Sequence, residues 1–225
     1  MDRRFLIGGG AAVVAAAAGS GIWYMNRPAE AQTQVNAGAA SPELDEIDTS
    51  SVVEMALGAE DAPVTMVEYA SFTCPHCADF HERVFNRLKT DYIDTGKVRF
   101  IYRDVYFDRY GLWASMIARC AGPDKFFGLA SMYYKSQDTW LRGAESEAQI
   151  ADNLRKIGRL AGMDDATLEE CLNDVDMART LTAWYQKNAQ ADEINATPTL
   201  LIDGEKHSNM TYADLQEILD GKLEG

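Results

Sequence analysis

Two cysteines separated by two residues lie where a predicted strand is followed by a predicted helix. Residues 63–69 form a short β-prone run, and the tetrapeptide Cys74-Pro75-His76-Cys77 follows it closely. After the tetrapeptide, four apolar residues recur at helical spacing and share one face: Phe80, Val84, Leu88 and Tyr92. A cysteine pair between a strand and a helix is typical of a redox dithiol. This feature fixes the order of the first two elements and suggests their chemistry.

The elements that follow predict an α/β fold. The alternating residues 98–102 predict a second strand, parallel to the first because a helix connects them. Residues that begin and end helices recur over about 108–193, and Asp164 is well placed to cap one of these helices. Residues 199–202 then form a strand that turns at Asp203-Gly204 into a hairpin. Thr211 then caps a last amphipathic helix. This order predicts a thioredoxin-like fold with an inserted helical subdomain at about 108–193.

The N-terminal segment has the features of an export signal. Arg3 and Arg4 form a basic start, an apolar run extends over 5–25, and Ala29-Glu30-Ala31 fits a signal peptidase. We expect residues 1–31 to be removed, although an uncleaved membrane anchor is the alternative. Residues 32–61 are polar and aperiodic, which predicts a flexible arm before the domain at 62–225. Both alternatives predict a periplasmic location for the folded part.

Composition limits the partners of the chain. Its 225 residues include 47% hydrophobic and 25% charged residues, as in ordinary globular proteins. The formal net charge of −14 would repel a phosphate backbone, so nucleic acid is excluded as a partner. The same charge favours a soluble monomer. Nothing in the sequence predicts a cofactor or a resident metal.

The position of Cys74 predicts an acidic thiol. Pro75 suits the first turn of a helix, so Cys74 lies at the cap, where free backbone N–H groups and the helix dipole stabilise a thiolate. A protonated His76 would lower the pKa of Cys74 further. Cys77, one turn later, is the expected buried resolving partner. Because a stabilised thiolate favours the reduced state, the Cys74–Cys77 disulfide is expected to be a strong oxidant.

Two other interpretations of the cysteine pair remain open. A structural disulfide suits an exported protein, although such a small loop constrains little chain. A metal-binding carrier is the second alternative, since Cys77 and His81 lie four residues apart on one helical face and could join Cys74 around copper or zinc.

Cys-Pro-His-Cys, the residues 68–73 before it and a later Thr197-Pro198 together resemble the DsbA-type periplasmic thiol:disulfide oxidoreductases. The resemblance covers about 62–223. It implies that Cys74 is the exposed nucleophile, Cys77 its partner and His76 the residue that tunes the thiolate. It also implies that Glu68 is a buried acid that relays protons for Cys77. Thr197-Pro198 would form a cis bond facing the pair and, with Pro75, bind extended substrate.

The resemblance implies partners and leaves the direction of electron flow open. It implies reduced, unfolded secreted polypeptides as substrates and a DsbB-like membrane partner that reoxidises the pair. Thr197 departs from the valine usual before this proline in the strongest oxidants, and is found in the disulfide isomerases instead. A disulfide isomerase or reductase of the same fold is therefore the alternative function.

A second pair, Cys120 and Cys171, lies in the predicted helical insertion. An even number of cysteines in an exported protein favours a bridge over two free thiols. We therefore expect a structural disulfide between them, similar to the additional bridge in some DsbA-type proteins.

Overall fold

The structure is a computed structural model that describes residues 46–224. The predicted export signal, residues 1–31, and the first part of the predicted arm lie outside the described residues. Within 46–224, no helix has both the length and the apolar character needed to cross a membrane.

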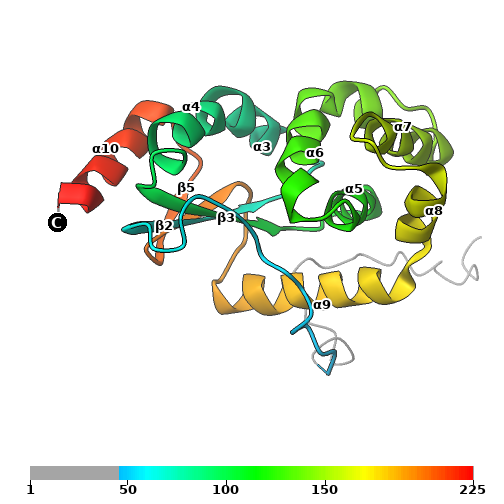
Figure 1. Ribbon diagram of the computed structural model, residues 1–225, viewed down its shortest axis with the longest axis horizontal. Coiled ribbons are helices and arrows are strands. Elements are labelled where there is room, and N and C mark those ends of the chain that lie inside the picture. The colour runs from blue at the N-terminus through cyan, green and yellow to red at the C-terminus, as the bar shows by residue number, and fades with distance from the viewer. Residues whose placement is uncertain (1–45, 225) are drawn as a thin grey trace, which may run out of the picture. The chain divides into compact units, whose positions relative to one another are not determined.

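In the described part of the chain, five strands form one mixed sheet (Figure 1). The strands are β1 (Met55–Leu57), β2 (Val64–Ala70), β3 (Val98–Asp104), β4 (Thr199–Ile202) and β5 (Glu205–Ser208). Their order across the sheet is β1-β3-β2-β4-β5. As predicted, β2 and β3 are parallel, and the other neighbours are antiparallel. The sheet and its helices confirm the thioredoxin-like fold with a helical insertion.

Strand β1 corrects the predicted boundary at Ala62. Residues 55–57 belong to the expected arm 32–61, yet they pair with β3, and Met55 is buried in the core. Three residues are too few for alternation to be read from sequence. The strand forms because residues 55–57 pair with the edge of β3 and because the Met55 side chain is buried in the core.

The helix after Cys74 alternates between two helical geometries. It comprises α3 (Pro75–Phe80), the π-helical η1 (His81–Phe85), α4 (Asn86–Leu88) and the π-helical η2 (Lys89–Ile93). The predicted apolar face repeats every four residues, which is longer than the about 3.6 residues of an α-helical turn. The wider π-helical turns keep that face toward the sheet. All four predicted face residues are buried: Phe80, Val84, Leu88 and Tyr92.

Helices fill the insertion between β3 and β4. They are α5 (Arg109–Cys120), α6 (Pro123–Lys135), the π-helical η3 (Asp138–Arg142), α7 (Glu147–Leu160), α8 (Asp165–Asn173) and α9 (Val175–Ala191). Pro123 begins α6, and the predicted cap Asp164 accepts a hydrogen bond from the Thr167 N–H at the start of α8. Local sequence signals therefore set these helix ends.

The C-terminal part of the chain completes the sheet. Asp203 and Gly204 both have positive φ, as a two-residue hairpin turn requires, and join β4 to β5. Thr211 precedes α10 (Tyr212–Glu224), and its Oγ1 accepts a hydrogen bond from the Asp214 N–H. Both features were predicted from the sequence.

Alternation along β2 determines which of its side chains face the helix that follows Cys74. Val64, Met66 and Ala70 face the main core beneath α3 and α10, whereas Val67 and Tyr69 face α9 on the other side of the sheet (Figure 1). Glu68 has the same parity as Met66. A fully buried carboxylate is thus placed on the α3 face of the sheet.

Candidate active site

The two cysteines of the tetrapeptide differ in their access to solvent. Cys74 is the N-cap residue of α3 and Pro75 occupies its first turn, as predicted. Cys74 is buried, with only 8% of its surface exposed, which is less than the exposed nucleophile that the resemblance implied, whereas Cys77, one turn later, has no exposed surface. Both are free thiols in this structure. Only Cys74 can therefore meet a thiol of another molecule.

The surroundings of Cys74 favour its thiolate. A hydrogen bond from the Cys77 thiol is the largest influence, and together with the Thr197 hydroxyl and the backbone N–H groups of Cys77 and His76 it lowers the pKa of Cys74 to about 5, against the opposing effect of burial. His76 thus acts on the sulfur through its backbone N–H. Its imidazole, which was predicted to tune the thiolate, lies on an exposed residue.

The surroundings of Cys77 have the opposite effect. Burial in the core is the main cause that raises the pKa of Cys77 well above the ordinary thiol value. The hydrogen bond to Cys74 and the negative charge of Glu68 add to the increase. At neutral pH the reduced pair therefore carries its negative charge on Cys74 and its proton on Cys77.

The loop before β4 faces Cys74. The peptide bond between Thr197 and Pro198 is cis. The Cys74 Sγ lies 3.5 Å from the Thr197 carbonyl oxygen, to which the protonated thiol donates a hydrogen bond. The Thr197 Oγ1 is buried and has no hydrogen-bond partner among the described residues, so its hydroxyl is free to donate to the Cys74 thiolate.

Glu68 forms a buried pair with His81. The Glu68 Oε2 lies 2.9 Å from the His81 Nε2, and both residues are almost without exposure. His81 therefore contacts a carboxylate, which differs from its place in the metal-carrier alternative. Among the described residues, no three His, Cys, Asp or Glu side chains are grouped as metal ligands would be.

Two residues that the sequence analysis missed hold the loop around Cys74. The Asp108 Oδ2 accepts a hydrogen bond of 2.8 Å from the Thr73 hydroxyl, while Oδ1 caps α5. The buried Gln137 Nε2 donates to the carbonyl oxygens of Phe72 and Cys74, at 2.9 and 3.0 Å. Gln137 lies more than 60 positions away in sequence, and no local pattern indicates such contacts. The insertion thus helps to fix the catalytic loop.

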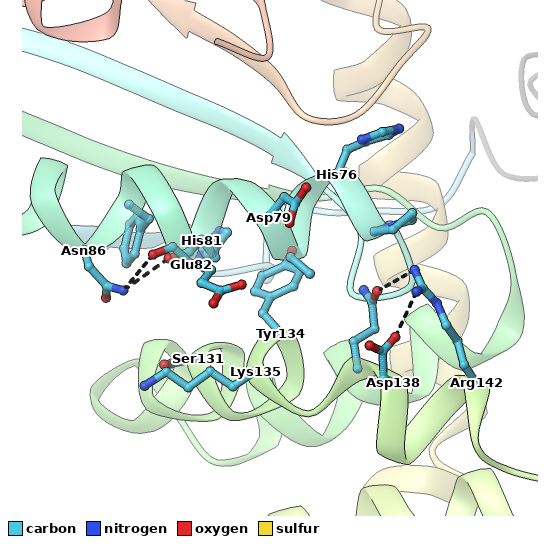
Figure 2. Close-up of a pocket in the computed structure, with 14 residues that line it drawn as sticks. His76, Asp79, His81, Glu82, Asn86, Ser131, Tyr134, Lys135, Asp138 and Arg142 are labelled. Carbon is cyan, nitrogen blue, oxygen red and sulfur yellow. Dashed lines mark hydrogen bonds and ion pairs between the residues drawn. The ribbon is translucent and has the colours of Figure 1, made fainter. Parts of the chain in front are cut away.

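Two cavities flank the tetrapeptide. One, of about 490 Å³, lies beside His76 and is lined by residues 195–199 and 206–209. The other, of about 580 Å³, lies between the α3–α4 helix and the α6–η3 region (Figure 2). His81 and Tyr134 are among the residues that line it. The first cavity lies against the cis-proline loop, and the second is lined in part by His81, which contacts Glu68.

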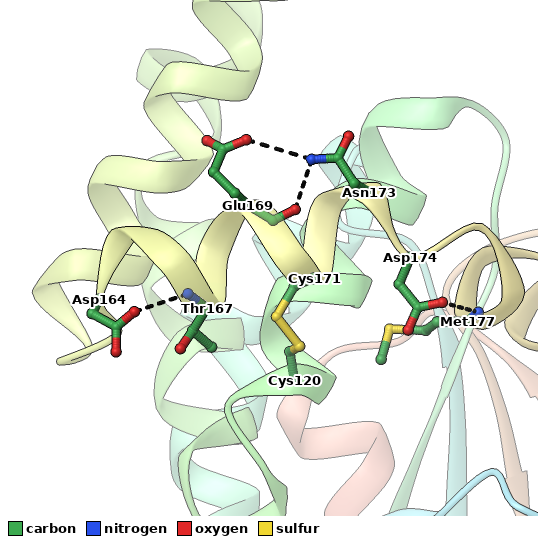
Figure 3. Close-up of a disulfide and its surroundings, with 8 residues drawn as sticks. All are labelled: Cys120, Asp164, Thr167, Glu169, Cys171, Asn173, Asp174 and Met177. Atoms are coloured by element: carbon green, nitrogen blue, oxygen red, sulfur yellow. Dashed lines mark hydrogen bonds between the residues drawn. A yellow bond between two sulfur atoms is a disulfide. The ribbon is translucent and has the colours of Figure 1, made fainter.

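The second cysteine pair is bonded in the structure. Cys120 at the end of α5 and Cys171 in α8 form a disulfide with a Cα–Cα distance of 6.1 Å (Figure 3). It joins α5 and α8 within the insertion. The expected bond between Cys120 and Cys171 is therefore confirmed, and its purely structural role stays a prediction.

Comparison with known proteins agrees with the fold. A family profile described as thioredoxin matches residues 50–221. The chain belongs to this thioredoxin family. The matched residues include the tetrapeptide, the helical insertion and the cis-proline loop, so the whole candidate site lies within the matched region.

Relatives of this thioredoxin-family chain carry names from disulfide chemistry. A Rickettsia typhi protein named as a protein-disulfide oxidoreductase is 31% identical over 76% of this chain, which spans 62% of that relative. The solved structure of Wolbachia pipientis alpha-DsbA1 is 28% identical, with a TM-score of 0.68 over 75% of this chain and 89% of that one. A protein-disulfide isomerase from Novosphingobium aromaticivorans is 26% identical, with a TM-score of 0.69 over 76% and 98%. The predicted resemblance to DsbA-type proteins is confirmed.

Proposed function

We propose that this chain is an exported thiol:disulfide oxidoreductase that introduces disulfide bonds into secreted polypeptides. The contrast between the two thiols carries the proposal. The pKa of Cys74 is lowered to about 5, while burial raises the pKa of Cys77 well above its ordinary value. The Cys74 sulfur is stable as an anion, whereas the Cys77 sulfur is buried and stays protonated. Thiol–disulfide exchange requires this difference between the attacking and the resolving thiol.

The reaction begins when the oxidised enzyme meets a substrate thiolate. The thiolate attacks the Cys74 Sγ, the Cys74–Cys77 bond breaks, and its electron pair leaves on the Cys77 Sγ, which then takes a proton. A second substrate thiolate attacks the substrate sulfur of the mixed disulfide and releases Cys74 as a thiolate. The low pKa of Cys74 makes it a good leaving group. The substrate loses two electrons, and the enzyme gains them as a reduced pair.

The direction of electron flow follows from the stability of the reduced form. An ordinary thiol is almost fully protonated at pH 7, whereas Cys74 is ionised there. This difference favours the reduced state by roughly 2 to 3 kcal/mol at pH 7. The disulfide form cannot gain this energy, so the pair tends to accept electrons and to oxidise its substrates.

The cis-proline loop is the proposed substrate site. The cavity of about 490 Å³ lies along residues 195–199, next to His76. An extended polypeptide placed there would have its cysteine beside the Cys74 Sγ and its backbone along Thr197 and Pro198, while Pro75 lines the neighbouring cavity and could contact the same polypeptide. Recognition through the backbone reads no particular side chain, which suits an enzyme with many clients.

The partners and location follow from the same chemistry. Clients would be reduced, unfolded secreted polypeptides, and a membrane partner of the DsbB type would reoxidise the Cys74–Cys77 pair. We place the domain in the periplasm, delivered by the signal at residues 1–31, and acting as a monomer. A Cys77→Ala variant would retain clients as mixed disulfides on Cys74 and thereby identify them.

A disulfide isomerase or reductase is the second candidate. Thr197 before the cis proline favours it, and so does the similarity to the protein-disulfide isomerase from Novosphingobium aromaticivorans. The equilibrium of the Cys74–Cys77 pair in glutathione buffers separates the two candidates. We expect a potential near the about −120 mV of a strong oxidant, and a value near the about −270 mV of thioredoxin would contradict the oxidase.

A further inference from the structure

The buried Cys77 needs a proton in every catalytic cycle, and its surroundings exclude water. When a substrate thiolate breaks the Cys74–Cys77 bond, the sulfur of Cys77 leaves as an anion that burial strongly disfavours. Glu68 is the ionisable group on the sheet face beneath the pair, and its charge acts on Cys77. Glu68 is itself fully buried, so it too must receive protons from another group.

His81 contacts Glu68 and also lines a cavity. Its Nε2 lies 2.9 Å from the Glu68 Oε2, and the second carboxylate oxygen, Oε1, is buried with no partner among residues 46–224. His81 also lines the cavity of about 580 Å³ between α3–α4 and α6–η3 (Figure 2). Its Nδ1 makes no hydrogen bond within the described part of the chain. The imidazole therefore contacts the buried carboxylate on one side and borders a cavity on the other.

The surrounding aromatic rings hold this imidazole in place. The His81 ring stacks between Phe85, at 4.6 Å between centroids, and Tyr134, at 4.2 Å. The Tyr134 hydroxyl is hydrogen-bonded to the hydroxyl of Tyr102, which is also buried. A ring packed on both faces keeps its nitrogen directed at Glu68, as proton transfer requires.

We propose that His81 carries protons between Glu68 and the water of this cavity, and so completes a path from Cys77 to solvent. During oxidation of a substrate, Glu68 gives a proton to the Cys77 thiolate, His81 returns one to Glu68, and water in the cavity returns one to His81. During reoxidation of the enzyme each transfer runs in reverse. His81 is a positioning and relay residue that acts through Glu68. This inference rests on the proposed roles of Cys74 and Cys77.

Other ionisable groups around His81 do not replace it in this role. Burial raises the pKa values of Tyr102 and Tyr134 well above the ordinary tyrosine value, so both stay protonated at neutral pH. Cys77 and Glu68 lie at the inner end of the path. The cavity wall adds charged side chains from α3, η1, α6 and η3: Asp79, Glu82, Lys135, Asp138 and Arg142. None of these makes a hydrogen bond or ion pair with Glu68 in the described part of the chain, whereas His81 does.

The test measures single-turnover reduction of the oxidised enzyme by glutathione, followed by acid quenching and alkylation of free thiols. His81→Gln keeps a hydrogen-bond donor for Glu68 but cannot relay a proton. We expect it to slow the reaction at least about tenfold at neutral pH and to alter the shape of the pH–rate profile. Glu82→Gln, on the wall of the same cavity, is the matched control and should leave both unchanged.

A rescue experiment separates proton transfer from packing. His81→Ala opens space beside the cavity, and added imidazole should restore its rate in proportion to concentration, with no effect on the wild-type enzyme. His81→Phe, which keeps the aromatic stack, should be as slow as His81→Gln. Rates equal to wild type in every variant would overturn the inference, as would a slowing that is uniform with pH and insensitive to imidazole. A wild-type enzyme that fails to react with glutathione would overturn the proposed function instead.

Discussion

The described part of the molecule contains two pairs of cysteines, one with free thiols and one joined in a disulfide. Cys74 and Cys77 are separated by two residues and are free thiols, whereas Cys120 and Cys171 are 51 positions apart and bonded. The first pair lies at a helix N-terminus beside a loop that supplies a hydroxyl group and a carbonyl oxygen. The second joins two helices of the insertion. The difference teaches that the groups around the sulfur, more than the spacing of the cysteines, determine whether a pair reacts or only constrains the chain.

Removing the sulfur of Cys74 should produce the largest effect. Cys74→Ser leaves no accessible sulfur in the first pair, so we expect oxidation of a reduced peptide to fall below detection, at least about a thousandfold. The measurement is the rate of disulfide formation in a peptide with two cysteines. The control is Cys120→Ala/Cys171→Ala, which should retain a rate close to that of wild type. Equal loss in both variants would contradict the division between the pairs.

Removing the second pair should instead affect stability. The Cys120–Cys171 bridge closes a loop of 51 positions. We expect Cys120→Ala/Cys171→Ala to lower the free energy of unfolding by about 2–4 kcal/mol, since the unfolded chain gains conformational freedom. Urea titration of the protein with Cys74 and Cys77 reduced measures this change in the free energy of unfolding. An unchanged unfolding midpoint, or a large loss of oxidase activity in a folded variant, would contradict a purely structural bridge.

The glutathione equilibrium of the first pair should depend on pH. Reduction by glutathione at pH 7 releases one proton, because Cys74 becomes a thiolate while free glutathione is protonated. The pKa of Cys74 is lowered to about 5, so the reduced fraction is favoured at higher pH and this advantage is lost as the pH falls through about 5. Between pH 7 and pH 5 we expect the equilibrium constant to fall roughly 50-fold. A constant that does not change over this range would contradict the assignment.

A smaller change should follow from the loop before β4. Thr197→Val removes the hydroxyl that stabilises the Cys74 thiolate but keeps the shape of the side chain. We expect the pKa of Cys74 to rise by about one unit, the equivalent of one hydrogen bond to a charged group. Thr199→Val, at the first residue of β4, is the control, because the Thr199 hydroxyl donates to the Ala196 carbonyl oxygen and not to Cys74. Titration of the thiolate in both variants decides whether the Thr197 hydroxyl is used.

The fold was largely accessible to prediction because its signals are local. Hydrophobic spacing, Pro75, the Asp203-Gly204 turn and the Asp164 cap each act within a few residues, and the structure places all of them as expected. Strand β1 escaped prediction because it is short and depends on an edge that only β3 supplies.

The candidate site was predictable only in part. Cys74, Cys77 and Glu68 could be identified from the tetrapeptide and the resemblance. The contacts of Gln137 with the catalytic loop could not, because they join segments more than 60 positions apart. The interaction of His81 with Glu68 also depends on how the helix lies across the sheet, so the sequence alone allowed a metal-ligand role for the same imidazole.

The central claim is that Cys74 is a stable anion while its neighbour holds a proton. The most direct test is the ultraviolet absorbance of the thiolate of the reduced protein, recorded as a function of pH and compared with Cys74→Ser. We predict a single thiol titration near pH 5 that is absent from the variant. A reduced protein whose first thiol ionises only near the ordinary value of about 8.5 would contradict the account.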